Sequence, residues 1–247
     1  MISNCLCGRR TLSTCVERIL LEASSIHVHH EPFGTPYYWG EEAPSRRQAD
    51  DTPRDASFAA VAADVFRAPM PAGITHVFSK DHAYYIMPHC LSRLADFTNG
   101  VDVRHSFIIR HPLRAIVSLY MKACVDNSST GYTYFDPAEA GFVAMWDLYC
   151  HIEETATPGS QPAPIIDADD LLEDPEGVMS AYCAAVGLPF DVSMLQWGEK
   201  PVPHQVSCQG KSRDLRRPED ARHPSLTDAL PCFPCSAAFQ LPVVWLD

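Results

Sequence analysis

An arginine and a serine mark the two ends of a segment in which a predicted strand gives way to a predicted helix. Arg110 follows the apolar run 107–109, and Ser118 lies eight positions later in SFIIRHPLRAIVSLY. In open α/β sheets, the carboxyl end of a strand and the N–H groups of the next helix bind anions, and a guanidinium suits phosphate. The spacing predicts a phosphate clamp. The alternative is a solvated strand end with a serine bonded to its own helix.

Basic and hydroxyl side chains also gather before a helix predicted at residues 13–23. They are Arg10, Thr11, Ser13 and Thr14. Such side chains, together with the positive end of the helix dipole, favour an anion. Serine and threonine are also ordinary helix N-caps. The Walker pattern GxxxxGK[ST] is absent, so we expect a phosphate loop of another kind.

Two side chains at predicted strand ends could accept a proton from a hydroxyl group. His82 lies in SKDHAYY, after a strand predicted at residues 75–79, and Glu31 follows a strand predicted at residues 26–29. Histidine titrates near neutral pH, whereas Glu31 would need a pKa raised by burial. His82 is the favoured base of the two. Each could instead be an ordinary surface or loop residue.

An aromatic segment follows Glu31. Residues 33–39, FGTPYYW, suit a pocket for a flat or apolar acceptor molecule, or a packed loop without a ligand. His27, His29 and His30 precede this segment, but strand alternation places His30 on the opposite face from the other two. We therefore expect no metal site there.

A parallel sheet would bring these groups together. Short apolar runs alternate with helical patterns, which predicts an α/β fold of three layers with a mostly parallel central sheet flanked by helices. Asp136 and Asp174 each precede a proline as N-caps do, and Gly187 suits a C-cap. Residues 32–55 and 157–164 are predicted loops. Strands are predicted at 2–7, 26–29, 75–79, 105–109 and 164–167, and helices at 13–23, 57–67, 113–125, 137–154 and 175–186.

Composition limits the classes of partner. The 247 residues suit one α/β domain at 1–197 and a proline-rich tail at 198–247 that packs on it. A formal charge of −12 argues against nucleic acid as a partner. The sequence shows neither an apolar run of membrane-spanning length nor a signal segment, so we expect a cytoplasmic protein without a membrane span. The oligomeric state is not predicted.

The ten cysteines are expected to be reduced thiols, because no signal segment precedes them. The pairs Cys5/Cys7 and Cys232/Cys235 would form a zinc site only if the two ends of the chain met. The first pair also has a single intervening residue, which is short for a zinc site. We expect no bound metal.

The order of residues around Arg110 resembles the 3′-phosphate-binding segment of the sulfotransferases that use 3′-phosphoadenosine 5′-phosphosulfate (PAPS). In that family an arginine at the strand end and a serine eight positions later hold the 3′-phosphate, and Arg110 and Ser118 match them. The matching residues are Phe107, Ile108, Ile109, Arg110, His111, Pro112, Arg114, Val117, Ser118 and Tyr120.

Further segments resemble the same family in the expected order. The loop with Arg10 is similar to its 5′-phosphosulfate loop, although Leu12 stands where a smaller residue is common. Lys80 and His82 resemble its Lys-x-His element, and Glu31 resembles the acidic base of some bacterial and carbohydrate sulfotransferases. Residues 165–195 resemble its later strand, acidic turn and helix. The terminal Arg-Lys-Gly element is not found, and residues 210–213 are a poor substitute.

The resemblance implies a P-loop-like sulfotransferase fold and transfer of a sulfuryl group from PAPS to a hydroxyl or amine of a small organic acceptor, in specialised metabolism. Arg10 would stabilise the charge on the bridging oxygen, Ser13 and Thr14 would hold the 5′-phosphate, and no metal would be needed. Two alternatives stay open. One is a divergent member that binds a nucleotide or biosynthetic intermediate without transfer. The other is a nucleotide kinase or hydrolase, which the missing Walker lysine disfavours.

Overall fold

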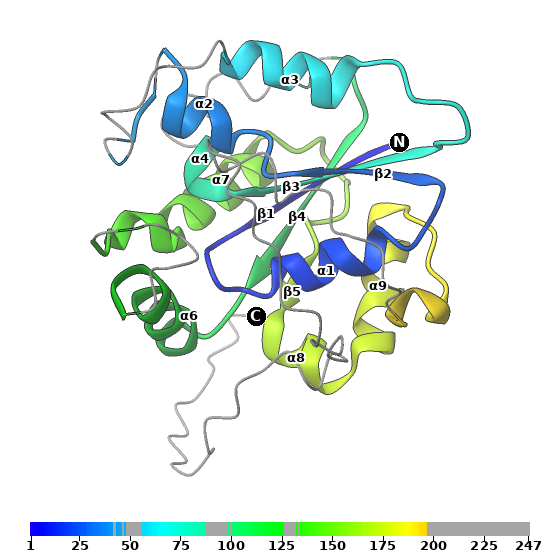
Figure 1. Cartoon of the computed structure of the whole chain (residues 1–247). Helices are drawn as coiled ribbons and strands as arrows, with labels where there is room; N and C mark the ends of the chain where they lie inside the picture. The colour runs from blue at the N-terminus through cyan, green and yellow to red at the C-terminus, as the bar shows by residue number, and fades with distance from the viewer. Residues whose placement is uncertain are drawn as a thin grey trace, which may run out of the picture.

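A five-stranded parallel sheet forms the centre of the protein (Figure 1). The computed structural model describes residues 1–41, 43–45, 47, 56–86, 98, 100–125, 132 and 134–196. The strand order is β2-β3-β1-β4-β5, and every neighbouring pair is parallel. The predicted α/β fold is therefore confirmed. The strands are β1 (Ile2–Cys7), β2 (Ile26–His30), β3 (His76–His82), β4 (Val103–Ile109) and β5 (Ile165–Asp167).

Helices cover both faces of the sheet. Figure 1 shows α2, α3, α4 and α7 on one side and α1, α8 and α9 on the other. The α-helices are α1 (Ser13–Leu20), α2 (Gly34–Trp39), α3 (Phe58–Arg67), α4 (Ala83–Ile86), α6 (Pro112–Tyr120), α7 (Phe142–Thr155), α8 (Ala168–Glu173) and α9 (Pro175–Val186). Shorter turns are the π-helical η1 (Met121–Val125) and the 3-10 helices η2 (Pro137–Ala140) and η3 (Val192–Leu195).

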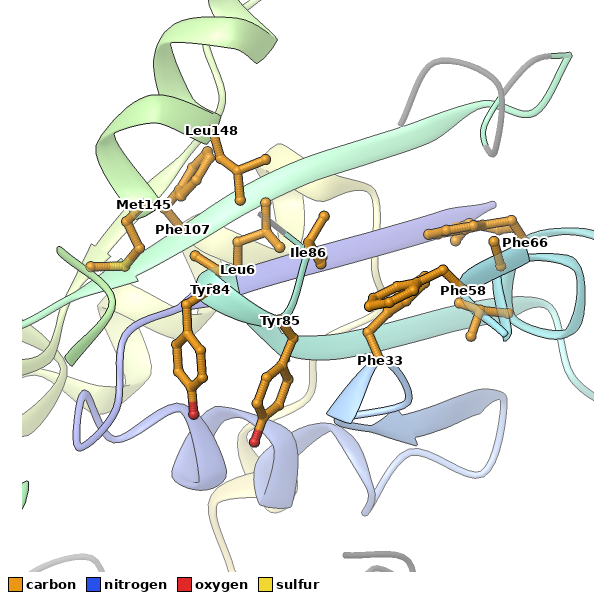
Figure 2. Close-up of a cluster of buried hydrophobic side chains, with 14 of the residues drawn as sticks. Leu6, Phe33, Phe58, Phe66, Tyr84, Tyr85, Ile86, Phe107, Met145 and Leu148 are labelled. Atoms are coloured by element: carbon orange, nitrogen blue, oxygen red, sulfur yellow. The ribbon is translucent and has the colours of Figure 1, made fainter. Parts of the chain in front are cut away.

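The central strand β1 is buried along its whole length. Because side chains alternate along a strand, Leu6 joins the core on one face, where Phe33 and Phe58 also lie (Figure 2). Cys5 and Cys7 join the core on the other face. The sheet is thus enclosed by two hydrophobic layers, and the main openings for a ligand are at its edges.

Strand β3 is longer than the sequence predicted. Lys80 and His82 lie inside the strand, whereas we expected them after it, because the main chain continues to pair with β1. Cys5 lies opposite Lys80 and Cys7 lies opposite His82. The prediction was wrong because the polar pattern SKDH is typical of a loop, and only the neighbouring strand keeps it extended.

Two other predicted elements were wrong. The predicted loop 32–55 contains α2, which buries Tyr38 and Trp39. The single helix predicted at 137–154 is two helices, η2 and α7, separated by Gly141 with a φ of 81°. The predicted caps are confirmed: Asp136 accepts from the Ala138 N–H, Asp174 accepts from the Gly177 N–H, and Gly187 ends α9 with a φ of 72°.

The predicted tail at 198–247 lies outside the described residues, and so do residues 210–213, Cys232 and Cys235. In the described part of the chain, no helix is long and apolar enough to cross a membrane. The same residues contain no cluster of three or more histidine, cysteine or acidic side chains that could hold a metal ion.

The turn into α1 has an unusual backbone. Its N-cap, Leu12, has a φ of 62° and a ψ of 16°, in the left-handed region. Its carbonyl accepts from the N–H groups of Cys15 and Val16, at 2.8 and 3.4 Å, and so begins the helix. A residue with a Cβ atom is strained in this conformation. Leu12 therefore departs from the common small residue at a position where backbone conformation favours glycine.

We predict opposite effects of two substitutions at this turn. Leu12→Gly should maintain or raise the free energy of unfolding, since glycine adopts a positive φ without a Cβ clash. Leu12→Val should lower it by about 1 kcal/mol or more, because a β-branched residue is most strained there. Urea unfolding of both variants measures the difference, and a valine variant more stable than the glycine variant would contradict it.

Candidate functional site

A cavity of about 360 Å³ lies where the carboxyl ends of β1, β2, β3 and β4 meet. In a parallel sheet these ends share one edge, which is the usual place of ligand binding. The cavity contains nearly all the residues singled out from the sequence, and Ser118 lies next to it through a bond to Arg10. The lining residues are Arg9, Arg10, Thr11, Leu12, Ser13, Thr14, Cys15, His30, Glu31, Tyr38, Trp39, Lys80, His82, Tyr85, Arg110 and Tyr132.

One end of the cavity is cationic. Arg10 Nε donates to Ser118 Oγ at 2.8 Å, and Arg110 Nη1 donates to the Arg10 carbonyl oxygen at 3.2 Å. The two predicted phosphate loops therefore meet. Burial, Arg110 and Arg9 together lower the pKa of Arg10, so its positive charge is less favourable here than in water. Among the described atoms, the buried Nε of Arg110 has no hydrogen-bond partner. An anion at this end would relieve both conditions.

The hydroxyl groups before α1 differ in their availability. Thr11 is buried and donates to the Gly8 carbonyl oxygen at 3.0 Å, so this hydroxyl shapes the loop. Thr14 is exposed and Ser13 is buried, and both line the cavity at the first turn of α1. The N-terminus of an eight-residue helix thus faces the cavity beside two arginines.

The other end of the cavity contains a buried ion pair. Lys80 Nζ lies 2.5 Å from Glu31 Oε1 and 3.8 Å from Glu17 Oε2, and the Lys80 side chain is 1% exposed. The Tyr85 hydroxyl donates to Glu31 Oε2 at 3.2 Å. Burial alone would raise the pKa of Glu31, but His82 and Lys80 hold it well below its usual range. The raised pKa that Glu31 was said to need as a base is therefore not found: its pKa is lowered instead.

The two predicted bases form one pair. His82 Nε2 lies 3.2 Å from Glu31 Oε1, and its Nδ1 lies 3.3 Å from Cys7 Sγ. Burial lowers the pKa of His82, which keeps the ring neutral near neutral pH. Burial raises the pKa of Cys7 to about 12, so it stays a thiol. If the neutral His82 ring carries its proton on Nε2 and donates it to Glu31, its Nδ1 faces the Cys7 thiol.

The sequence did not indicate the role of Arg9. Its side chain donates to the hydroxyl groups of Tyr84, Tyr38 and Tyr132, at 2.5, 2.7 and 2.7 Å. Glu139 lies 4.0 Å from its Nε. These partners come from distant parts of the chain. The only local signal was the position of Arg9 next to Arg10, and the tertiary structure alone brings the tyrosines to it.

The aromatic segment contributes only partly to the cavity. Tyr38 and Trp39 line it, as Tyr85 and Tyr132 do from other parts of the chain. Phe33, which we also expected at the pocket, is 1% exposed and lies in the core with Phe58 and Phe66. Figure 2 shows the hydroxyl groups of Tyr84 and Tyr85 directed away from that core.

The histidines of β2 follow the predicted alternation. The rings of His27 and His29 are 4.6 Å apart on one face. His30 lies on the other side, where its Nδ1 is 2.7 Å from Glu17 Oε2 and its Nε2 is 3.7 Å from Glu31 Oε1. Glu17 and His30 were missed as site residues, because nothing in the spacing of α1 and β2 indicated their contact.

Comparison with known families agrees with this arrangement. Residues 1–206 match the family described as "Sulfotransferase domain", which is most of the 247-residue chain. The chain belongs to the sulfotransferase family. The match includes the entire described sheet and every residue of the cavity.

Individual sulfotransferases and related proteins show more distant similarity. The structure resembles the crystal structure of a sulfotransferase from Alicyclobacillus acidocaldarius with a TM-score of 0.51 at 15% identity, covering 78% of this chain and 87% of that one. Two proteins from Arabidopsis thaliana, the branched-chain-amino-acid aminotransferase-like proteins 2 and 1, are 29% and 32% identical over 100 residues. These matches cover 40% of this chain but only 15% and 16% of those proteins.

We predict that Glu31 makes the stability of the fold sensitive to acid. Its pKa is lowered from 4.5 in the folded chain, so the unfolded chain binds more protons between the two pKa values. The stabilisation is fully present above about pH 4.5 and is lost as the pH falls toward the lowered pKa. Urea unfolding at several pH values should therefore show that acid lowers the free energy of unfolding less in Glu31→Gln than in the unchanged protein.

Glu41→Gln is the matched control, because Glu41 is an exposed residue. In this variant, acid should lower the free energy of unfolding as much as it does in the unchanged protein. Parallel stability curves for Glu31→Gln and Glu41→Gln would show that Glu31 does not cause the effect.

Proposed function

We propose that this sulfotransferase-family protein transfers the sulfuryl group of PAPS to a hydroxyl group of a small organic acceptor in the cavity. The observation that carries this proposal is the arrangement of one cavity, with two arginines and a helix N-terminus at one end and the Glu31–His82 pair at the other. The first end suits a phosphate leaving group, and the second suits a hydroxyl that must lose a proton.

The donor would bind along the cationic end. The first turn of α1, with Ser13 and Thr14, would hold the 5′-phosphate, and Arg10 would stabilise charge on the bridging oxygen. Arg110 and Ser118 would hold the 3′-phosphate. Ser118 Oγ accepts from Arg10 Nε in this structure. The 3′-phosphate would therefore have to replace this hydrogen bond between Arg10 and Ser118 when the nucleotide binds. The unpartnered Nε of Arg110 supports its role.

The reaction moves SO₃ from the phosphate oxygen to the acceptor oxygen, breaks the old S–O bond, and releases the hydroxyl proton. We assign the proton to Glu31, with His82 as the residue that orients it. Both ring nitrogens of His82 already face partners, whereas Glu31 Oε2 faces only the Tyr85 hydroxyl among the contacts of the described residues. A carboxylate suffices as base if the proton leaves late, as it does in kinases that use an aspartate.

In this scheme Lys80 does not bind phosphate. Its ammonium group is enclosed and paired with Glu31 and Glu17. It therefore holds Glu31 ionised and in place. The aromatic side chains of Tyr38, Trp39 and Tyr132 would contact the acceptor, which favours one with a flat or apolar body.

We predict that Arg110→Ala weakens binding of 3′-phosphoadenosine 5′-phosphate by about 10- to 100-fold, the effect of a lost charge-assisted hydrogen bond. Isothermal calorimetry measures the affinity. Arg104→Ala is the control: Arg104 lies on β4, the strand that Arg110 follows, and its exposed side chain bonds to the Ala185 carbonyl oxygen, so affinity should be unchanged. No binding by the unchanged protein would disprove the proposed donor.

Binding without transfer from labelled PAPS to a panel of phenols and alcohols would favour a divergent, non-transferring member.

We predict that Glu31→Gln lowers the transfer rate by at least about 100-fold with nucleotide affinity unchanged, as expected for loss of a general base. His82→Asn retains a donor toward Glu31 and should lose less activity. The rate of the unchanged protein should stay level as pH falls from 7.5 to about 5, because the pKa of Glu31 is lowered. A larger loss of rate in His82→Asn, together with a rate of the unchanged protein that falls as the pH drops toward the lowered pKa of His82, would assign the base to His82 instead.

A further inference from the structure

Helix α6 exposes most of its large apolar side chains. Ala115, Leu119 and Ala123 of α6 and η1 are buried against the domain. Exposed apolar side chains occupy the opposite side over both elements, at three- and four-residue spacing, which makes one continuous stripe on a helix. These are Leu113 (72% exposed), Ile116 (37%), Val117 (55%), Tyr120 (50%), Met121 (40%) and Val125 (59%), with Cys124 also exposed.

This α6 stripe departs from the usual pattern. An amphipathic helix on the surface of a globular protein normally turns its apolar side chains to the core and its charged side chains to solvent. Figure 1 shows α6 at the outer edge of the molecule, away from the centre of the sheet. The two charged residues of this segment lie beside the stripe, since Arg114 bonds to Asp169 at 2.7 Å and Lys122 is half-buried.

The size of the α6 stripe matches that of a protein interface. The exposed fractions above add up to about three fully exposed side chains, or roughly 500 Å² of apolar surface on each chain, which is in the range of the largest apolar patches on single proteins. Two such surfaces would together bury on the order of 1,000 Å², which is where specific interfaces begin. Single exposed apolar residues need no explanation, but a contiguous patch of this size indicates an interaction site.

We propose that the α6 stripe is the contact surface between two copies of this chain, with the two α6 helices antiparallel. A twofold axis brings one surface against itself, so the surface must be self-complementary. The stripe meets this condition because it is apolar from end to end. An antiparallel pair places Leu113 of one copy near Val125 of the other, with Val117 and Tyr120 near the axis. The spacing is that of side chains that interlock between paired helices.

The proposal does not depend on the sulfotransferase reaction. It has one consequence for the site, because Ser118 lies within α6 and accepts from Arg10. Pairing would restrain the helix that carries this serine. Nucleotide binding and self-association are nevertheless measured by separate experiments, so failure of one proposal does not disprove the other.

Sedimentation analysis of the full chain over about 1–100 μM tests the proposal, because a dimer of micromolar affinity dissociates measurably over this concentration range. We expect a reversible monomer–dimer equilibrium. Val117→Asp should weaken it at least about tenfold, because the substitution places two carboxylates near the axis. Val143→Asp is the matched control: Val143 lies on α7, is 75% exposed and is not part of the α6 stripe. It should associate as the unchanged protein does.

Val125→Asp provides a second test at the end of the α6 stripe, and it should also weaken the dimer. Thermal unfolding confirms that each variant is folded, since all three positions are exposed in the single chain. A monomer over the full concentration range would overturn the proposal. This result is also the one expected if another segment of the chain covers the α6 stripe. Equal effects of Val117→Asp and Val143→Asp would overturn it as well.

Discussion

The buried ion pair between Lys80 and Glu31 is the interaction on which the site depends. It joins the carboxyl end of β3 to the turn that follows β2, in a place where an unpaired charge would be costly. Loss of one partner in such a pair typically costs about 3–5 kcal/mol. The pair also explains the backbone of Glu31, whose φ of 47° is held in a strained region. Strain at this residue is tolerated because Lys80, His82 and Tyr85 all hold its carboxylate.

Strain and charge are concentrated around one cavity. Among the described residues, the non-glycine residues with positive φ are Arg10, Leu12 and Glu31, and all three line it. Within the cavity, Arg10 and Arg110 lie at the end near α6, whereas the Glu31 carboxylate lies at the other end, where Lys80 and His82 contact it. This separation suits a reaction in which a leaving group becomes more negative while an incoming hydroxyl loses a proton. A fold organised for stability alone would have little reason to collect these features at one sheet edge.

Helix α6 connects the site to the outer surface. Its first turn follows Arg110, its middle carries Ser118, and its outer side is the α6 stripe. Ala115, Leu119 and Ala123 pack against the domain, while most of the other apolar side chains remain outside. One helix therefore serves two surfaces whose roles can be tested independently.

Local sequence signals were sufficient to predict much of the framework. Alternating apolar runs and helical patterns were enough to predict the parallel α/β fold, and aspartate–proline pairs were enough to predict where η2 and α9 begin, because these signals are local. The order of Arg10, Glu31, His82 and Arg110 along strand ends also predicted that they share an edge. Tertiary structure alone decided that Glu31 and His82 are one pair, that Lys80 lies within a strand, and that Arg9 meets three tyrosines. These outcomes depend on contacts between residues far apart in the chain and on burial, which sets the pKa values, and neither is encoded in local spacing.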